Sequence, residues 1–275
     1  MNKWFAKHKW VTMLIFNVLV WIPVILILDM ANIVLSPGWV IYGLFMFFFS
    51  YMWADSFKIV LLNKALATFD NMCDPCPLEE TVWEQLSYVK SKSQRIGLFI
   101  NLSAVLDATG RYDEFAVSLE RIDIDTCTSV TPLIKCVYYH NLACSYLRTK
   151  RMELVPFLLQ KEHQILSNLK VRRKLKNKLA ESYNLNLADF HICNKEYDIA
   201  NSLIETICLE NVSLRYKVTI NSLKAQILIE TGKPDEAKPF LQFVIDYGNK
   251  LYDVTNAKQM LEQIGKDGNN ESVIF

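Results

Sequence analysis

The chain has 275 residues, of which 51% are hydrophobic and only 8 are glycine, and its mean hydropathy is +0.12. It carries 30 Lys and Arg against 29 Asp and Glu, so the net charge of +1 gives no reason to expect a nucleic-acid partner. The apolar excess lies at the N-terminus, which excludes an ordinary soluble enzyme. The charged residues before position 54 are Lys3, Lys7, Lys9 and Asp29.

Two uncharged apolar segments follow one another near the N-terminus, from Trp10 to Leu28 and from Ile33 to Trp53. A helix of nineteen residues reaches about 28 Å, close to the roughly 30 Å hydrocarbon core of a bilayer. We therefore expect residues 1–54 to form a transmembrane hairpin, with spans at about 10–28 and 33–53. A cleaved signal peptide is the alternative, but residues 29–32 are a poor cleavage site.

Basic residues flank the two apolar segments on their outer sides. Lys3, Lys7 and Lys9 precede the first segment, and the short connection between the segments contains no basic residue. Lys58 and Lys64 follow the second segment. Because basic residues favour the cytoplasmic side, we expect a multi-pass cell-membrane protein with both termini in the cytoplasm. The seven cysteines all follow the spans, and their odd number suits a reducing compartment.

Beyond residue 54, apolar residues recur every three or four positions, which predicts helices throughout. Residues 55–92 are expected to form membrane-proximal helices, and residues 266–275 a flexible tail. Between residues 93 and 265 a pattern recurs: an Asn-Leu-small triplet begins at Asn101, Asn141 and Asn186, each before a polar turn. A fourth unit turns at Gly232 without the asparagine. These units predict helical hairpins.

The hairpin units resemble the tetratricopeptide repeat (TPR) family. The first helix carries a small residue, the turn at Gly110 has the Gly-x-Tyr-Asp-Glu form, and Ala200 and Ala237 open their second helices as the family's alanine does. Turn spacings of 40, 45 and 37 residues exceed the family's roughly 34. Four residues depart from the pattern: Phe115, Val155, Lys150 and Lys195. The resemblance completes the predicted fold class: all-α, two transmembrane helices followed by a TPR-like α-solenoid.

The resemblance also implies a partner-binding groove. In some TPR proteins an asparagine at this place holds the backbone of an extended peptide, because an amide side chain both donates and accepts hydrogen bonds. The alternative is that the asparagines only pack the stacked repeats. The residues expected to line the groove are Asn101, Asp107, His140, Asn141, Arg148, Asn186 and Asp189.

A run of six basic residues is the candidate for contact with membrane lipids, since each cation near an anionic membrane contributes about 1 kcal/mol to binding. The alternative is a solvated helix start. The run comprises Lys170, Arg172, Arg173, Lys174, Lys176 and Lys178. No aromatic residues interleave with it, which disfavours nucleic acid.

Cysteine and histidine patterns leave metal or redox chemistry as the less favoured interpretation. Cys73 and Cys76 form a Cys-x-x-Cys pair, which alone gives two ligands and also suits a helix start beside prolines. Cys136, His140 and Cys144 share one helical face, where cysteine commonly acts as a small buried hydrophobe. We expect no metal and no cofactor.

The sequence contains no motif for catalysis: G-x-G, G-x-S-x-G and H-E-x-x-H patterns are absent. We therefore expect a non-enzymatic adaptor or scaffold, tethered to the membrane, that binds a peptide or protein partner at the cytoplasmic face. Two alternatives remain open: a regulatory sensor that responds to a peptide, and an assembly factor for a membrane complex.

Overall fold

The computed structural model describes residues 4, 8–30, 37–210 and 212–271, and every regular element within these residues is a helix. This confirms the all-helical prediction. The chain divides into two compact units, Met1–Leu66 and Ala67–Phe275.

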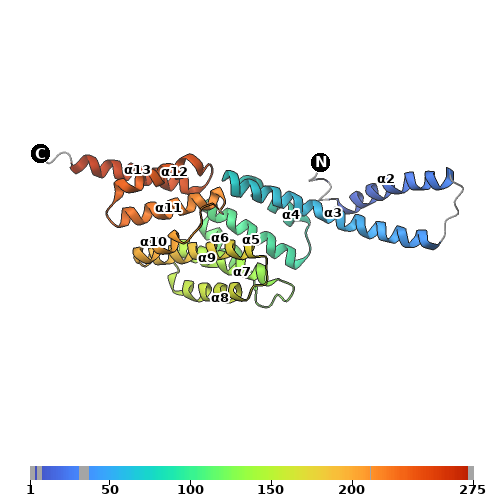
Figure 1. The fold of residues 1–275 in the computed structure, drawn as a ribbon, viewed down its shortest axis with the longest axis horizontal. Coiled ribbons are helices and arrows are strands. Elements are labelled where there is room, and N and C mark those ends of the chain that lie inside the picture. The colour runs from blue at the N-terminus through green and yellow to red at the C-terminus, as the bar shows by residue number, and fades with distance from the viewer. Residues whose placement is uncertain (1–3, 5–7, 31–36, 211, 272–275) are drawn as a thin grey trace. The chain divides into compact units, whose positions relative to one another are not determined.

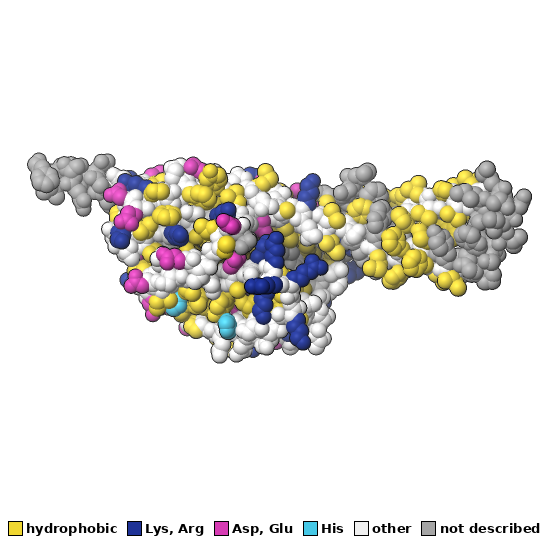
Figure 2. Space-filling model, in the orientation of Figure 1, with side chains coloured by type: hydrophobic (Ala, Val, Ile, Leu, Met, Phe, Trp, Pro, Cys, Tyr) yellow, Lys and Arg dark blue, Asp and Glu magenta, His cyan; other side chains and the backbone are white. Residues whose placement is uncertain are grey.

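The first unit contains α2 (Lys9–Met30) and the first part of α3 (Pro37–Met72). The two helices lie side by side, because Nδ2 of Asn17 donates to Oγ of Ser50 over 2.8 Å and the rings of Phe16 and Phe49 lie 6.4 Å apart. Ser50 is fully buried between them. Their outward side chains are largely apolar and exposed (Figure 2).

The prediction of a transmembrane hairpin is wrong. Among residues 8–30 and 37–271, leaving out 211, we find no helix with both the length and the apolar character that crossing a membrane requires. The prediction treated the second apolar run as a separate span that ends at Trp53. The structure instead places residues 37–53 of that run at the start of one 36-residue helix, which continues through Asp55, Lys58 and Lys64. Residues 31–36, which include part of the expected connection and the start of the second expected span, lie outside the described residues.

The predicted localisation depended on the two spans and is wrong for the same reason. A multi-pass cell-membrane protein with two cytoplasmic termini requires helices that cross the bilayer. The flanking lysines could orient such spans but could not supply them.

The second unit stacks helical hairpins (Figure 1), and its packing is compatible with an α-solenoid. In each hairpin the two helices contact each other, and the first helices of successive hairpins also contact each other. The end of α3 and α4 (Cys76–Tyr88) precede four hairpins, and a final helix follows them. The hairpins are α5 (Lys92–Ala108) with α6 (Tyr112–Glu120), α7 (Pro132–Arg148) with α8 (Val155–Asn168), α9 (Arg173–Cys193) with α10 (Tyr197–Glu205), and α11 (Leu214–Glu230) with α12 (Pro234–Tyr247). A short 3₁₀ helix, η1 (Met152–Leu154), precedes α8, and the final helix is α13 (Tyr252–Glu271). It continues through most of the segment expected to be a tail.

One turn geometry ends the first helix of all four hairpins. The turn residue has a positive φ in each case: Gly110 (74°), Lys150 (58°), Lys195 (61°) and Gly232 (76°). The N–H of the following residue then donates to the carbonyl five residues back, as Arg111 does to Leu106 over 2.9 Å. These are Schellman turns, which glycine favours because other residues lose roughly 1–2 kcal/mol in this conformation.

Small side chains recur in register with these turns. The residue seven positions before each turn is small and completely buried: Ser103, Ala143, Ala188 and Ala225. The residue five positions after each turn is also buried: Phe115, Val155, Ala200 and Ala237. Small residues let neighbouring helices approach closely, so the hairpins bury faces that no single hairpin could cover.

Candidate functional site

The second unit contains a pocket of about 80 Å³ between the first helices of the four hairpins and the start of α13. Its lining combines carboxylates, guanidinium groups and tyrosine rings. These residues are Asp107, Asp189, Asp253, Arg148, Arg215, Tyr112, Tyr216 and Tyr252. The chain therefore brings charged side chains from five helices to one place.

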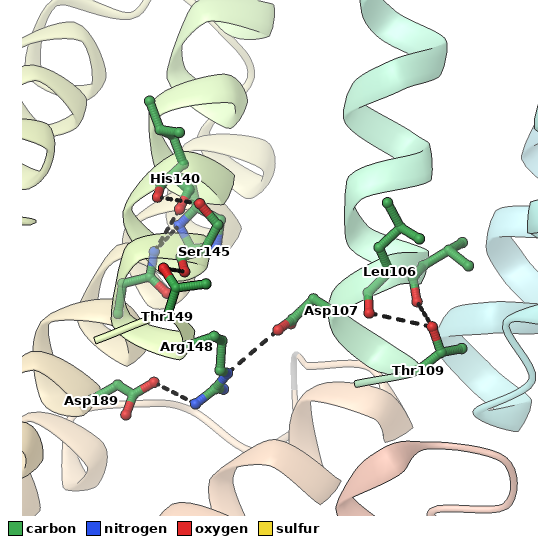
Figure 3. Close-up of polar contacts among 11 residues, drawn as sticks. Leu106, Asp107, Thr109, His140, Ser145, Arg148, Thr149 and Asp189 are labelled. Atoms are coloured by element: carbon green, nitrogen blue, oxygen red, sulfur yellow. Dashed lines mark hydrogen bonds and ion pairs between the residues drawn. The ribbon is translucent and has the colours of Figure 1, made fainter. Parts of the chain in front are cut away.

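Arg148 lies at the centre of the pocket's ion pairs (Figure 3). As the last residue of α7, it places Nη1 at 2.9 Å from Oδ2 of Asp189 on α9 and Nε at 3.4 Å from Oδ1 of Asp107 on α5. The charge of Asp189 raises the pKa of Arg148 well above its ordinary value. One guanidinium group thus joins the first helices of three hairpins.

Arg215 forms a second ion pair at the edge of the pocket. Its Nε lies 3.0 Å from Oδ1 of Asp70, and its guanidinium group lies 4.5 Å from the ring centre of Phe69 and 4.8 Å from that of Tyr216. A second pocket, of about 200 Å³, shares Ser182, Arg215 and Tyr216 with the first. The two pockets therefore form neighbouring parts of one site.

Asp253 differs from the other carboxylates of the pocket. It lies in the first turn of α13, and burial raises its pKa, while the charge of Arg148 lowers it and that of Asp107 raises it further. Within the described part of the chain, no hydrogen bond or ion pair reaches its carboxylate. Asp253 is therefore a negative group without a direct partner, as is Glu181 in the second pocket, whose Oε2 is buried without a hydrogen bond to the described residues.

The structure brings together five of the seven residues predicted for the groove. Those that line the pocket are Asp107, His140, Arg148, Asn186 and Asp189. Asn101 and Asn141 do not line it. The binding role of all seven stays a prediction.

The amide groups of two predicted asparagines bond the preceding hairpin. Nδ2 of Asn141 donates to the carbonyl oxygen of Ile100 over 3.1 Å and to Oγ of Ser103 over 2.9 Å. Nδ2 of Asn186 donates to the carbonyl oxygen of His140 over 2.9 Å. Both asparagines are buried, and their donors join one first helix to the next.

We expect Asn141→Ala to lower the free energy of unfolding by about 2 kcal/mol, because two buried hydrogen bonds are lost at about 1 kcal/mol each. Asn101→Ala is the matched control. It changes the same residue type at the equivalent position, which is partly exposed and has no side-chain hydrogen bond to the described residues. Urea denaturation of both variants measures the difference. Equal losses would show that the Asn141 bonds do not stabilise the stack.

Most of the predicted basic run is exposed to solvent. Lys170, Arg172, Arg173, Lys174 and Lys178 are exposed, whereas Lys176 donates from Nζ to the carbonyl oxygen of Ser167 over 3.0 Å. Lys178 also lines the second pocket. Contact of this run with lipid stays a prediction.

The cysteine patterns do not converge on a metal-binding geometry. Cys73 is buried, which raises its pKa to about 11, while Cys76 is exposed. Burial raises the pKa of Cys136 to about 12. In the described ranges, no three side chains of His, Cys, Asp or Glu lie together as a metal site would need.

Comparison of the chain with protein-family models, curated proteins and solved structures finds no match. The resemblance to TPR proteins therefore stays a prediction. The fold and the site define an all-helical protein with repeat-like packing and a charged pocket on its first helices.

Proposed function

We propose that this protein is a TPR-like interaction module that binds an extended segment of a protein partner at the pocket around Arg148. The observation that carries the proposal is the pocket itself, whose wall comes from the first helices of four successive hairpins. Turns and small residues that keep the same register in all four hairpins support the TPR-like part of it.

The size of the pockets favours peptide side chains over a small metabolite. Sites for small molecules typically measure about 300–1,000 Å³. The two pockets here measure about 80 and 200 Å³ and share three residues, so each suits one side chain of an extended segment. Stacked hairpins form the kind of continuous surface on which solenoid proteins bind such segments.

The proposal is tested by panning a displayed library of random twelve-residue peptides on the full chain and measuring the affinity of the enriched peptides. Ala108→Phe places a ring in the pocket wall, and Thr219→Phe does so from another helix. We expect either change to weaken binding at least tenfold, because the ring occupies the space of the peptide side chain. Circular dichroism and thermal melting check that the variants remain folded.

Ala67→Phe is the matched control, since Ala67 is exposed and does not line the pocket. It should leave the affinity unchanged. Failure to enrich any peptide, or peptides that bind folded Ala108→Phe and Thr219→Phe as tightly as the parent, would contradict the proposed function.

A further inference from the structure

We infer that the pocket binds a cationic side chain, a guanidinium or ammonium group, and that Asp253 is the carboxylate that receives it. The inference rests on the proposed function, because the cation is assigned to a residue of the bound segment.

The pocket carries a surplus of negative charge. Arg148 is already paired with Asp107 and Asp189, and Arg215 is already paired with Asp70. The pocket lining holds three carboxylates, Asp107, Asp189 and Asp253, against these two guanidinium groups, and Arg215 is shared with Asp70 outside the pocket, so the acidic groups are in excess. The neighbouring pocket adds one charge of each sign, Lys178 and Glu181, which form no ion pair with each other among the described residues. In the pocket around Arg148 an anionic ligand would have to displace a carboxylate from an arginine, whereas a cation adds to the existing pairs.

Asp253 is the carboxylate best placed to bind that cation. Its two oxygens can accept a pair of hydrogen bonds from a guanidinium group, and such bonds are stronger in a partly buried site. Its pKa is raised by burial, so the ionised form is disfavoured in the free protein. A bound cation would stabilise the ionised carboxylate of Asp253 and so lower its pKa.

Tyrosine rings supply the rest of the cation site. Tyr112 and Tyr252 contact each other edge to face, with ring centres 5.8 Å apart and planes at 88°, and Tyr216 lines the same pocket. Ring faces attract a guanidinium or ammonium group through their quadrupole. The pocket therefore combines a carboxylate without a direct partner and aromatic walls, as a site for a cationic side chain requires.

The same geometry predicts that Asp253 reduces the stability of the free protein. An acid whose pKa is raised in the folded state holds its proton more tightly there than in the unfolded chain. The free energy of unfolding therefore falls as pH rises from the pKa of the unfolded chain to the higher pKa of the folded state. Asp253→Asn should therefore raise the melting temperature at pH 7.5, and the gain should vanish near pH 3. Asp107, Asp189, Arg148, Arg215 and His140 face the same pocket and remain in both proteins, so the difference isolates Asp253.

Binding is tested on the full chain with Nα-acetyl-arginine methylamide and its neutral analogue, Nα-acetyl-citrulline methylamide. Backbone amide shifts of Tyr252 and Asp253 in nuclear magnetic resonance spectra report occupancy. We expect the arginine probe to bind at least tenfold more tightly than the citrulline probe. Asp253→Asn should abolish most of that preference.

Asp235→Asn is the matched control, because Asp235 lies in the first turn of α12 and its side chain is 85% exposed outside the pocket. It removes the same charge and should leave the preference for arginine unchanged. Equal affinities for the two probes, or a preference that persists in folded Asp253→Asn, would overturn the inference.

The two proposals fail in different ways. Enriched peptides that lack Arg and Lys, yet lose affinity for Ala108→Phe, would overturn the cation inference and leave the proposed function in place. Binding of the arginine probe with no peptide enriched would support the cation site and contradict the proposed function.

Discussion

Arg148→Met is expected to lower the free energy of unfolding by about 3 kcal/mol. The substitution keeps an unbranched apolar side chain but leaves Asp189, whose side chain is only 8% exposed, without its counterion. Removing one partner of a buried ion pair typically costs about 3–5 kcal/mol. The lower end applies because Arg148 and Asp107 retain some contact with solvent.

Arg151→Met is the matched control for Arg148→Met. Arg151 forms an ion pair with Glu120 and stacks on the ring of Tyr146, but the side chains of the pair are 41% and 34% exposed, so we expect a loss of at most about 1 kcal/mol. Equilibrium denaturation in urea measures both variants. Adding Asp189→Asn to Arg148→Met should recover part of the lost stability, since the unpaired charge is removed. Equal losses in the two single variants would show that burial adds nothing to the Arg148 pairs.

The helical hairpins could be predicted because their signals are local. The turn residues Gly110, Lys150, Lys195 and Gly232 lie within a few positions of the groups they bond, so the turn sequence determines where each first helix ends. The buried small residues could be predicted in the same way, because they keep a fixed spacing from the turn residues. Local chemistry of this kind can be read without knowing the neighbouring hairpin.

The role of the asparagines could not be read in this way. Asn141 bonds Ile100, which lies 41 residues earlier, and only the stacking of α7 against α5 decides whether its amide points at the neighbouring helix or into a groove. The membrane prediction failed for a related reason. Apolar composition was taken to define two spans, although α3 continues through charged residues.

Several pocket residues that sequence reasoning missed, apart from Tyr112 and others on earlier hairpins, belong to the fourth hairpin and the final helix. Arg215, Tyr216, Tyr252 and Asp253 lie beyond the last recurring asparagine, so the pattern that identified the groove ended before them. The available signal was the aromatic-acidic pair Tyr252-Asp253, which opens α13. Its place in the site became visible only once α13 packed against α11 and α12.

Gly110→Ala is expected to lower the free energy of unfolding by about 3 kcal/mol. The backbone of Gly110 has a φ of +74°, which costs another residue roughly 1 kcal/mol or more. A methyl group there would also lie 2.6 Å from Cγ and 2.7 Å from Cδ2 of Tyr252. The ring must move, and overpacking of this kind costs about 1–3 kcal/mol.

Gly232→Ala separates the two contributions, because Gly232 has nearly the same φ of +76° but no atom within 4 Å of the added methyl group. It should lose only about 1 kcal/mol from the backbone conformation. Thermal and urea denaturation of both variants, with the tyrosine fluorescence of each, give the comparison. The remaining difference of about 2 kcal/mol measures the contact between the turn of the first hairpin, at Gly110, and Tyr252 on α13. Equal losses would show that Tyr252 does not pack on this turn, and the pocket wall formed by Tyr112 and Tyr252 would then be open in solution.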